Sequence, residues 1–314
     1  WKVTFSDTIG KEEWVIARNM DEALAKLKAK HGSVFHMRLE QDEDVLDTWF
    51  SSALWPFVLF GWPDTSKKSF EDFFPTSLLE TGHDILFFWV ARMVMCSMAL
   101  TGKIPFQEIY MHAMVRDKTG EKMSKSKGNV IDPIDVLNGI TLEGLHEKLQ
   151  QSNLDKKEID KAVKLQQKAF PKGIPQCGSD ALRFGLLAYT VSGRNVNLDI
   201  DRIVGYRQFC NKLWNAVKFS VHFALGDNFV YRSCDESTPL PFECKWILSR
   251  LDACIDLCTT SFKTYDFGTC TSAIYSFWLY EFCDVFLEVI KPKIYNESTE
   301  KTHIQNTVFY VIER

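Results

Sequence analysis

The sequence has no closely spaced cysteine pair of the kind that indicates a disulfide framework or a zinc site. Its nine cysteines are an odd number, and the nearest two, Cys254 and Cys258, are four residues apart. Small secreted proteins carry an even set, and structural zinc needs four Cys or His ligands. Cys254 and Cys258 would share a helix face, but no second pair accompanies them. We therefore expect packed thiols in a reducing compartment and no metal site.

An uninterrupted apolar run long enough for a bilayer is also missing. The most apolar stretch, from Ile85 to Leu100, contains Arg92, whereas a membrane span needs about 20 apolar residues. The chain opens on Trp1, and no signal-peptide pattern follows. We expect a buried helix at this stretch, a cytoplasmic location and no membrane partner. A mitochondrial location stays open, because a transit peptide would lie upstream.

An excess of positive charge is absent as well. Lys and Arg total 37 and Asp and Glu total 41, so the net charge is −4. This balance excludes a globally basic nucleic-acid-binding protein but leaves room for a local basic patch. Hydrophobic residues make up 46% of the 314 residues. That composition is typical of a soluble globular protein, and the length suffices for two compact domains.

The pattern of the first 38 residues predicts a small separate segment. Lys2–Phe5 and Glu13–Ala17 alternate like short strands around a turn at Gly10. Asp21 is placed to cap a helix that ends at Gly32.

Helices and short apolar runs alternate between residues 39 and 200. An apolar helix is predicted from Asp84 to about Leu100, and Ile109–Val115 follows as a short buried strand. A helix followed by a strand is the alternation of a parallel α/β sheet. A polar helix is predicted from Asp155, its cap, to Phe170, before Pro171.

The pattern from residue 201 to 314 is helical throughout. Ala273–Ile290 is apolar on most faces and should be a central helix that Pro292 stops, whereas residues 226–241 should form a loop. We expect an antiparallel helix bundle.

The sharpest local feature is the string Lys-Met-Ser-Lys-Ser at residues 122–126. Between Arg116 and Lys127 there are five basic and two acidic residues, a local charge of +3 in an acidic chain. Lysine ammonium groups and serine hydroxyls suit a polyphosphate, and Gly128 lets the backbone approach a ligand closely. Charge alone favours a plain solvated basic loop.

The whole string changes that balance, because it resembles the second signature motif of the class I aminoacyl-tRNA synthetases. Further blocks are similar to the valine-specific branch of that family, namely Gln41–Pro56, Glu80–Arg92, Gly173–Phe184 and Tyr206–Asn215. They follow the family's order. The isoleucine-specific branch is similar but tends to differ after the Asp-x-Trp-Phe element and in the Gly-x-Asp block.

The resemblance implies a fold. Residues 39–200 would form the α/β second half of a Rossmann-like nucleotide-binding domain, with the lysine loop and a stem-contact region. Residues 201–314 would form an incomplete, all-α anticodon-binding helix bundle, and residues 1–38 would connect to an upstream editing domain. The implied substrates are valine, tRNA(Val) and ATP with Mg²⁺, without a bound prosthetic group. A translation-factor or synthetase complex stays open as a partner.

The resemblance also implies roles for individual residues. Lys122 and Lys125 would act as catalytic residues that hold the ATP phosphates. Further ATP-binding positions would be Gly82, Asp84, His112, Met114, Val115, Met123, Ser124 and Ser126. The valine pocket would consist of Trp49, Trp89 and Asp47, and weak candidates for tRNA contact are Arg202, Arg207, Lys212 and Lys218. Other interpretations are a helix cap for Asp84, core packing for the tryptophans and His112, and a solvated face for the basic residues.

One expected element is missing. Class I enzymes carry a His-x-Gly-His signature upstream, and none of the seven histidines here stands in that arrangement. We therefore expect a fragment of a valine–tRNA ligase that is inactive by itself. A non-catalytic tRNA-binding module and an inactive truncated paralogue are the alternatives.

Overall fold

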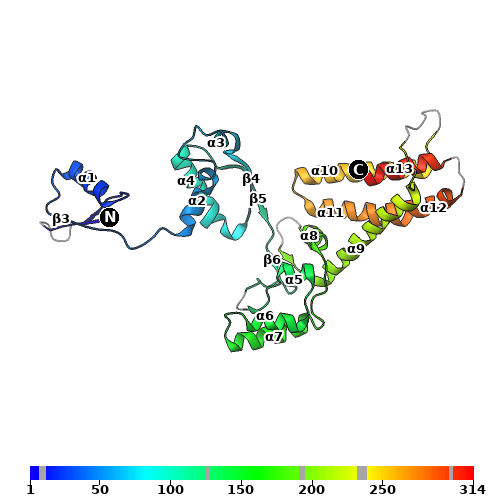
Figure 1. Ribbon diagram of the computed structural model, residues 1–314, viewed down its shortest axis with the longest axis horizontal. Coiled ribbons are helices and arrows are strands. Elements are labelled where there is room, and N and C mark those ends of the chain that lie inside the picture. The colour runs from blue at the N-terminus through cyan, green and yellow to red at the C-terminus, as the bar shows by residue number, and fades with distance from the viewer. Residues whose placement is uncertain (7–11, 125–126, 191–194, 232–238, 297–299) are drawn as a thin grey trace. The chain divides into compact units, whose positions relative to one another are not determined.

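The computed structural model describes residues 1–6, 12–124, 127–190, 195–231, 239–296 and 300–314. The chain divides into two compact units, Trp1–Tyr110 and Met111–Arg314 (Figure 1), and each is described by itself.

The first unit begins with a small antiparallel sheet covered by one helix. Its elements are the strands β1 (Lys2–Phe5), β2 (Glu12–Trp14) and β3 (Met37–Glu40), in the order β2-β1-β3, and the helix α1 (Met20–His31). Leu27 of α1 packs on Val3 and Phe5 of the sheet. The expected cap was wrong: the side chain of Asn19 accepts from the Glu22 amide, and Asp21 lies inside the first turn. The end at Gly32 is confirmed.

The rest of the first unit is an α/β segment. Its elements are α2 (Thr48–Val58), α3 (Lys68–Phe73), β4 (Thr76–Gly82), η1 (His83–Ile85), η2 (Leu86–Ala91), α4 (Arg92–Thr101) and β5 (Phe106–His112), whose last two residues belong to the second unit. The Thr76 amide donates to Pro105 at 3.0 Å, so β4 and β5 begin side by side.

Two burial predictions for this segment were wrong. Val90 and Met93 pack with Phe106 of β5, so η2 and α4 cover one face of the β4–β5 pair. Phe87, however, is 74% exposed, and Met111 of the expected buried strand is 54% exposed. Continuous apolar strands are typical of a sheet that is covered on both faces. The described residues of this unit cover only one face of the β4–β5 pair, so the side chains on the other face stay exposed. The helical stretch His83–Thr101 is long and apolar enough to cross a membrane. Length and composition are weak evidence for a membrane span, because core helices of soluble proteins have both properties as well.

The second unit begins with a parallel strand pair and a set of short helices. These elements are β6 (Val115–Arg116), α5 (Pro133–Asn138), α6 (Leu142–Gln150), α7 (Lys156–Ala169), α8 (Ser179–Ala188) and β7 (Val196–Asn197). Val115 pairs with Val196. The predicted cap of α7 is confirmed, since Asp155 accepts from the Glu158 amide. A core built around Val136, Leu182 and Ile203 joins these helices to the next one.

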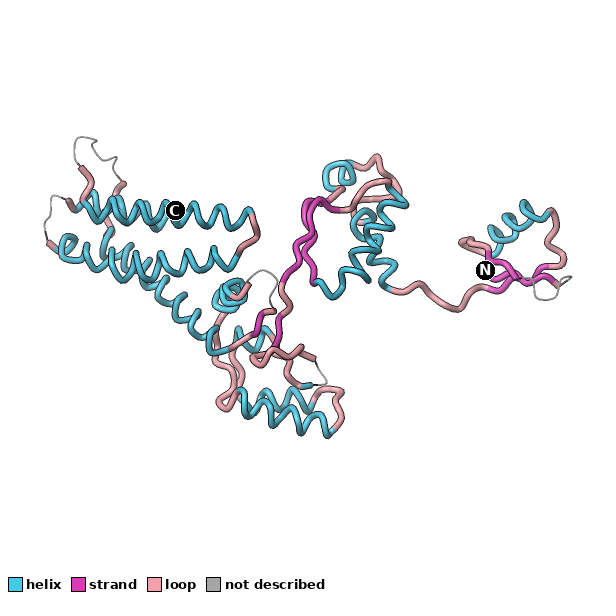
Figure 2. Tube along the Cα trace, turned by 180° about the vertical axis from the view of Figure 1, so that it is seen from behind, coloured by secondary structure: helices cyan, strands magenta, loops and turns pink. Residues whose placement is uncertain are grey.

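The remaining helices form the expected bundle (Figure 2). They are α9 (Ile200–Phe219) with η4 (Ser220–Leu225), α10 (Phe242–Lys263), α11 (Phe267–Ser276) with η5 (Phe277–Phe286) and α12 (Leu287–Tyr295), and α13 (Lys301–Glu313). Ile247, Phe282 and Ile304 meet in its core. The expectation that Pro292 stops the central helix was wrong, since α12 continues to Tyr295.

Candidate functional site

In the first unit, Trp49 contacts an aromatic ring and an arginine of the following helical stretch. The ring centroids of Trp49 and Phe88 lie 6.4 Å apart. The Arg92 guanidinium lies 5.9 Å from the Trp49 ring centroid and 5.7 Å from that of Phe88. These distances are typical of cation–π contacts. Phe88 and Arg92 were not predicted as neighbours of Trp49, although both lie in the block Glu80–Arg92 that resembles the family.

Trp89 and Asp47 have structural roles in the same unit. Trp89 is half-buried and packs with the core of Val90, Met93 and Phe106, on the sheet side of η2. Asp47 caps α2, where its carboxylate accepts from the Trp49 amide at 2.8 Å. The cap fixes the start of the helix that carries Trp49, so Asp47 can position that ring even without touching a ligand.

Gly82 and Asp84 lie where β4 gives way to helix. Gly82 is the buried last residue of β4 and precedes η1, with an ordinary extended φ of −85°. Asp84 is exposed in the first turn of η1, and Gly82, not Asp84, occupies the cap position. The helix-cap interpretation of Asp84 was therefore wrong. A carboxylate after a strand and beside a helix N-terminus is suitably placed to accept from ligand hydroxyls.

In the second unit, His112, Met114 and Val115 follow one another through the strand ends. His112 is half-buried, and its Nδ1 lies 3.1 Å from the Ala113 carbonyl oxygen. The Met114 carbonyl accepts from the Val196 amide at 2.9 Å, and Val115 pairs with Val196. The backbone groups of Met114 and Val115 are thus partly engaged in the β6–β7 pair.

The lysine loop is defined here as residues 122–127, and it follows the turn Asp117–Gly120. In that turn the Gly120 amide donates to the Asp117 carbonyl at 2.9 Å, and Gly120 has a φ of +85°. The Lys122 side chain is exposed, and its backbone pairs with that of Arg116 in an isolated antiparallel β-bridge. Met123 and Ser124 are half-buried. Lys125 and Ser126 lie outside the described residues.

Two of the four α9 residues suggested for tRNA contact have partners inside the protein. The Arg202 guanidinium lies 4.0 Å from the Tyr189 ring centroid. The Lys212 ammonium lies 3.1 Å from the Asp284 carboxylate, and that hydrogen bond raises the pKa of Lys212. Arg207 and Lys218 are exposed.

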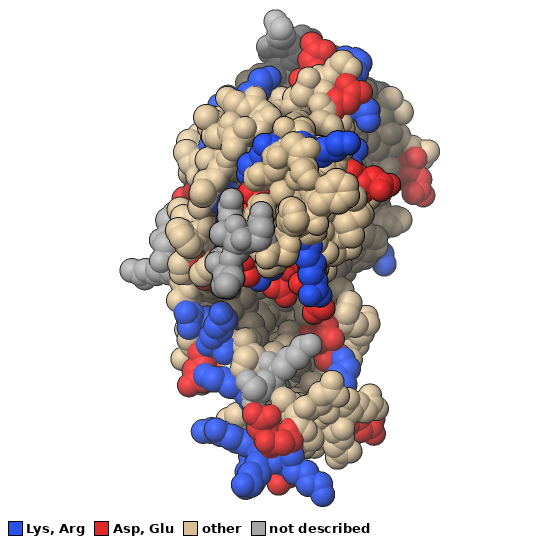
Figure 3. All heavy atoms as spheres, turned by 90° about the vertical axis from the view of Figure 1, so that its left-hand side faces the viewer, with Lys and Arg blue, Asp and Glu red and all other residues tan. Residues whose placement is uncertain are grey.

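A more pronounced basic face lies on α7. Lys157, Lys161, Lys164 and Lys168 recur at spacings of four, three and four, which places them on one side of the helix. All are exposed, opposite the buried Ala162 and Gln166, and none has an ion-pair partner among the described residues. Figure 3 shows Lys and Arg side chains gathered at the bottom of the view, around the helices labelled α6 and α7 in Figure 1.

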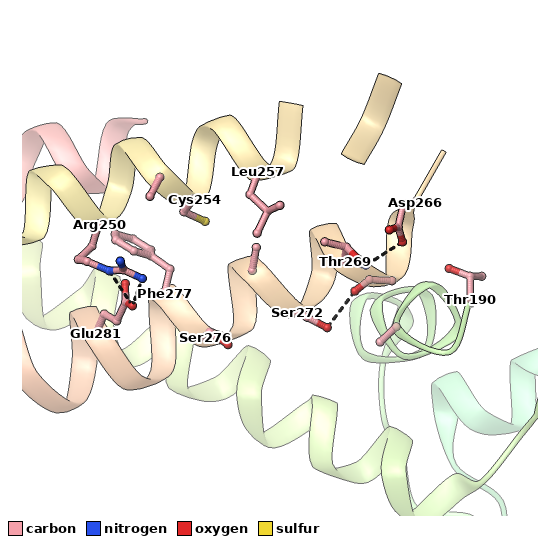
Figure 4. A pocket seen from close by; sticks show the side chains of 14 residues that line it. Thr190, Arg250, Cys254, Leu257, Asp266, Thr269, Ser272, Ser276, Phe277 and Glu281 are labelled. Carbon is pink, nitrogen blue, oxygen red and sulfur yellow. Dashed lines mark hydrogen bonds and ion pairs between the residues drawn. The ribbon is translucent and has the colours of Figure 1, made fainter. Parts of the chain in front are cut away.

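A cavity of about 600 Å³ opens between α10, α11 and the end of α8 (Figure 4). Its two acidic side chains have partners in the cavity wall: Arg250 Nη2 lies 2.7 Å from Glu281, and Asp266 accepts from the Thr269 backbone amide at 3.1 Å. The Cys254 thiol also lines it, and burial raises the pKa of that thiol to about 12. Among the described residues, none of those predicted to bind ATP, valine or tRNA lines this cavity.

Comparison with known proteins defines the class. The family model of the class I tRNA synthetases for I, L, M and V matches residues 3–199, and the anticodon-binding domain of tRNA ligases matches residues 244–314. The chain therefore belongs to the class I tRNA synthetases.

The similar individual proteins are valine–tRNA ligases. The chain is 56% identical to the valine–tRNA ligase of Mus musculus over 283 residues, which are 89% of this chain and 22% of that protein. It is 50% identical to mitochondrial valine–tRNA ligase 1 of Arabidopsis thaliana over 307 residues, 96% of this chain and 27% of that protein. The chain thus spans about a quarter of the length of these relatives.

A solved structure supports the fold. The LeuRS–tRNA–LeuAMS ternary complex of Agrobacterium radiobacter K84 superimposes with a TM-score of 0.58 at 17% identity, covering 95% of this chain and 33% of that one. The predicted fold class is confirmed: the chain carries part of a Rossmann-like catalytic domain followed by a helical anticodon-binding bundle.

Proposed function

We propose that this chain is the part of an ATP-dependent valine–tRNA ligase that carries the lysine loop and the start of the anticodon-binding bundle. The observation that carries the proposal is the intact Lys-Met-Ser-Lys-Ser string inside the region matched by the synthetase family. The valine specificity is supported by the identity of 50–56% to valine–tRNA ligases over most of the chain. Valine, ATP with Mg²⁺ and tRNA(Val) are the substrates, and no prosthetic group is required.

The chemistry has two steps. A carboxylate oxygen of valine attacks the α-phosphorus of ATP, the bond to the bridging oxygen breaks, and pyrophosphate leaves with valyl-adenylate formed. A ribose hydroxyl at the tRNA terminus then attacks the valyl carbonyl carbon, and AMP leaves. Negative charge moves onto the leaving pyrophosphate in the first step. Ammonium groups of Lys122 and Lys125 that engage fully at that point stabilise the transition state more than the bound substrates.

The other residues bind and orient. Trp49 and Trp89 supply flat apolar walls for an aliphatic side chain. Asp84 accepts from the ribose hydroxyls, and the backbone at Met114 and Val115 lies beside the adenine with His112. A hydroxyl isostere is rejected only about 10²-fold by such a pocket, as the established discrimination against threonine shows. Proofreading therefore falls to a separate hydrolytic domain.

The catalytic constellation is incomplete without a His-x-Gly-His element, which is absent from this sequence. The isolated 314-residue chain is therefore expected to be inactive. A non-catalytic tRNA-binding module is the second candidate, favoured by that same absence. We place the protein in the cytoplasm, and mitochondria are the alternative, because one of the similar relatives is a mitochondrial valine–tRNA ligase.

The test is valine-dependent exchange of pyrophosphate into ATP by the complete protein that contains this chain. We expect exchange, and a loss of roughly 10²–10³ in rate for Lys125→Ala, the scale of losing one strong electrostatic donor. The isolated chain should bind tRNA and show no exchange. A normal rate in Lys125→Ala would refute the role of the lysine, and a complete protein that binds tRNA without exchange would favour the binding module.

A further inference from the structure

A partly buried hydrogen-bond network joins the turn before the lysine loop to Asn129, two residues beyond the loop. One carboxylate oxygen of Asp117 accepts from the Thr119 amide at 3.0 Å, the Thr119 hydroxyl at 2.7 Å and the Glu121 amide at 2.8 Å. The other oxygen accepts from the Asn129 side chain at 2.7 Å. Burial by itself would raise the pKa of Asp117, but these hydrogen bonds together outweigh it and lower the pKa. The carboxylate is therefore held ionised at neutral pH.

Asn129 carries the network across to the backbone of the loop. Its amide nitrogen, which donates to Asp117, also lies 3.4 Å from the Lys122 carbonyl oxygen. Its amide oxygen accepts from the Ser124 backbone amide at 3.0 Å. One side chain thus contacts the backbone on both sides of Met123. The Asp117–Asn129 pair closes a ring around the segment that presents Lys122.

The exit of the loop is fixed by a second contact. Gly128 is buried with a φ of +65°, and a Cβ placed there would lie 2.1 Å from the Cβ of Ala162 in α7. The Lys127 ammonium lies 2.8 Å from the Glu121 carboxylate, across the loop. Both ends of the loop are therefore anchored to ordered structure next to Asn129, whereas Lys122 is exposed.

We propose that Asp117 and Asn129 form a clamp that positions the lysine loop for adenylate formation. The inference rests on the proposed function, because it assigns the pair to the same reaction. A pre-organised loop base lowers the entropy lost when flexible lysines converge on a polyphosphate, and a displacement of about 1 Å can cost roughly 10²-fold in rate. Neither side chain touches the reacting atoms in this assignment, so both are positioning residues.

The pair can be tested by exchanging its two members in the complete protein. In Asp117→Asn the new amide nitrogen faces the Asn129 amide nitrogen, so that two donors oppose each other. If the Asn129 amide turned over to avoid this, its nitrogen would face the Ser124 backbone N–H, which is also a donor. Asn129→Asp places two carboxylates together. The double exchange Asp117→Asn with Asn129→Asp restores a donor–acceptor pair and keeps an acceptor for Ser124.

We expect each single variant to lower kcat for pyrophosphate exchange roughly 10- to 100-fold, with KM for valine and the melting temperature unchanged. The double exchange should recover to within a few-fold of wild type. Amide hydrogen exchange over residues 119–124 should accelerate in both single variants and slow again in the double. Asp64→Asn is the matched control, because Asp64 also accepts from a backbone amide and a hydroxyl, those of Ser66.

Four outcomes are decisive. Single variants that keep kcat within two-fold overturn the clamp, and so does a folded double variant without recovery. A fall in melting temperature that accounts for the whole loss of activity, with kcat per folded molecule unchanged, reduces the pair to a structural role and overturns it too. A wild-type protein without valine-dependent exchange refutes the proposed function itself, and the clamp with it. That result differs visibly from a defect confined to the variants.

Discussion

The ammonium of Lys118, in the turn before the lysine loop, lies 3.1 Å from the carboxylate of Asp199, the residue that caps α9. Asp201, in the first turn of α9, lies 3.1 Å from the same ammonium. Hydrogen bonds to Asp201 and then to Asp199 raise the pKa of Lys118. The turn that leads into the loop is thus tied to the first helix of the bundle.

The two ends of this contact should differ in their effect on stability. Asp199→Ala removes a cap that accepts from the Asp201 amide at 3.1 Å, and should lower the free energy of unfolding by about 1 kcal/mol. Lys118→Met leaves the cap, and the Lys118 side chain is 63% exposed, so it should change stability little. Urea unfolding followed by circular dichroism measures both. Equal losses in the two variants would show that the ion pair, not the cap, stabilises this corner.

Gly128 should be among the least replaceable glycines in the second unit. An alanine there suffers left-handed backbone strain and a collision with Ala162, which together should cost roughly 2–4 kcal/mol. Gly226→Ala is the matched control, because Gly226 has a φ of +74° but open space around it. Adding Ala162→Gly to Gly128→Ala should restore the steric part only. The comparison fails if Gly128→Ala and Gly226→Ala melt at the same temperature.

Lys293 should make the bundle sensitive to both acid and alkali. Its ammonium lies 2.5 Å from Glu243 and 2.7 Å from Glu300, and hydrogen bonds to these two, Glu243 first, raise the pKa of Lys293. Burial alone would raise the pKa of Glu243, but the hydrogen bond to Lys293 outweighs it and lowers that pKa.

The contributions of Glu243 and Lys293 to stability depend on pH in opposite directions. Glu243 stabilises the fold fully above its unfolded pKa of about 4.3, and this contribution disappears as the pH falls through the lowered pKa. Lys293 stabilises the fold fully below about pH 10.4, and its contribution disappears as the pH rises through the raised pKa. Melting temperatures measured from pH 3 to 8 should therefore differ between wild type and Glu243→Gln at neutral pH and converge in acid. Glu313→Gln, near the exposed end of α13, should run parallel to wild type.

The basic face of α7 should contribute to RNA binding. A variant with Gln at all four lysines of this face, Lys157, Lys161, Lys164 and Lys168, should bind tRNA more weakly in the complete protein. Its binding should also depend less on salt, because each lost phosphate contact makes the plot of log affinity against log salt concentration less steep. The same four changes to Arg keep the charge and should keep affinity. Filter binding between about 50 and 200 mM salt gives both quantities. An unchanged slope in the Gln variant would leave α7 as a solvated face.

Local signals in the sequence predicted local structure well. Asp155 at the start of α7 and Gly32 at the end of α1 both lie where the sequence placed them. Each involves residues within a few positions of one another, so the chain needs no tertiary context to specify them. The cap of α1 was the exception: the sequence predicted Asp21, and Asn19, two residues earlier, caps the helix instead.

Packing between distant segments decided the rest. Pro292 does not end its helix, because Ile290 and Ile294 on either side of it are buried in the bundle core and hold the chain helical. The expected burial of Ile109–Val115 failed for the complementary reason. An apolar run is buried only if another layer covers it, and the described residues of the first unit cover one face of the β4–β5 pair.

The candidate site shows the same division. The lysine string, the Gly82 and Asp84 pair and the motif order could be recognised in the sequence, because they are short stretches that resemble the motifs of the family. The contacts of Asp117 with Asn129 and of Lys118 with Asp199 join residues 12 and 81 positions apart. A sequence specifies which donors and acceptors exist, but only the folded backbone brings them within hydrogen-bonding distance.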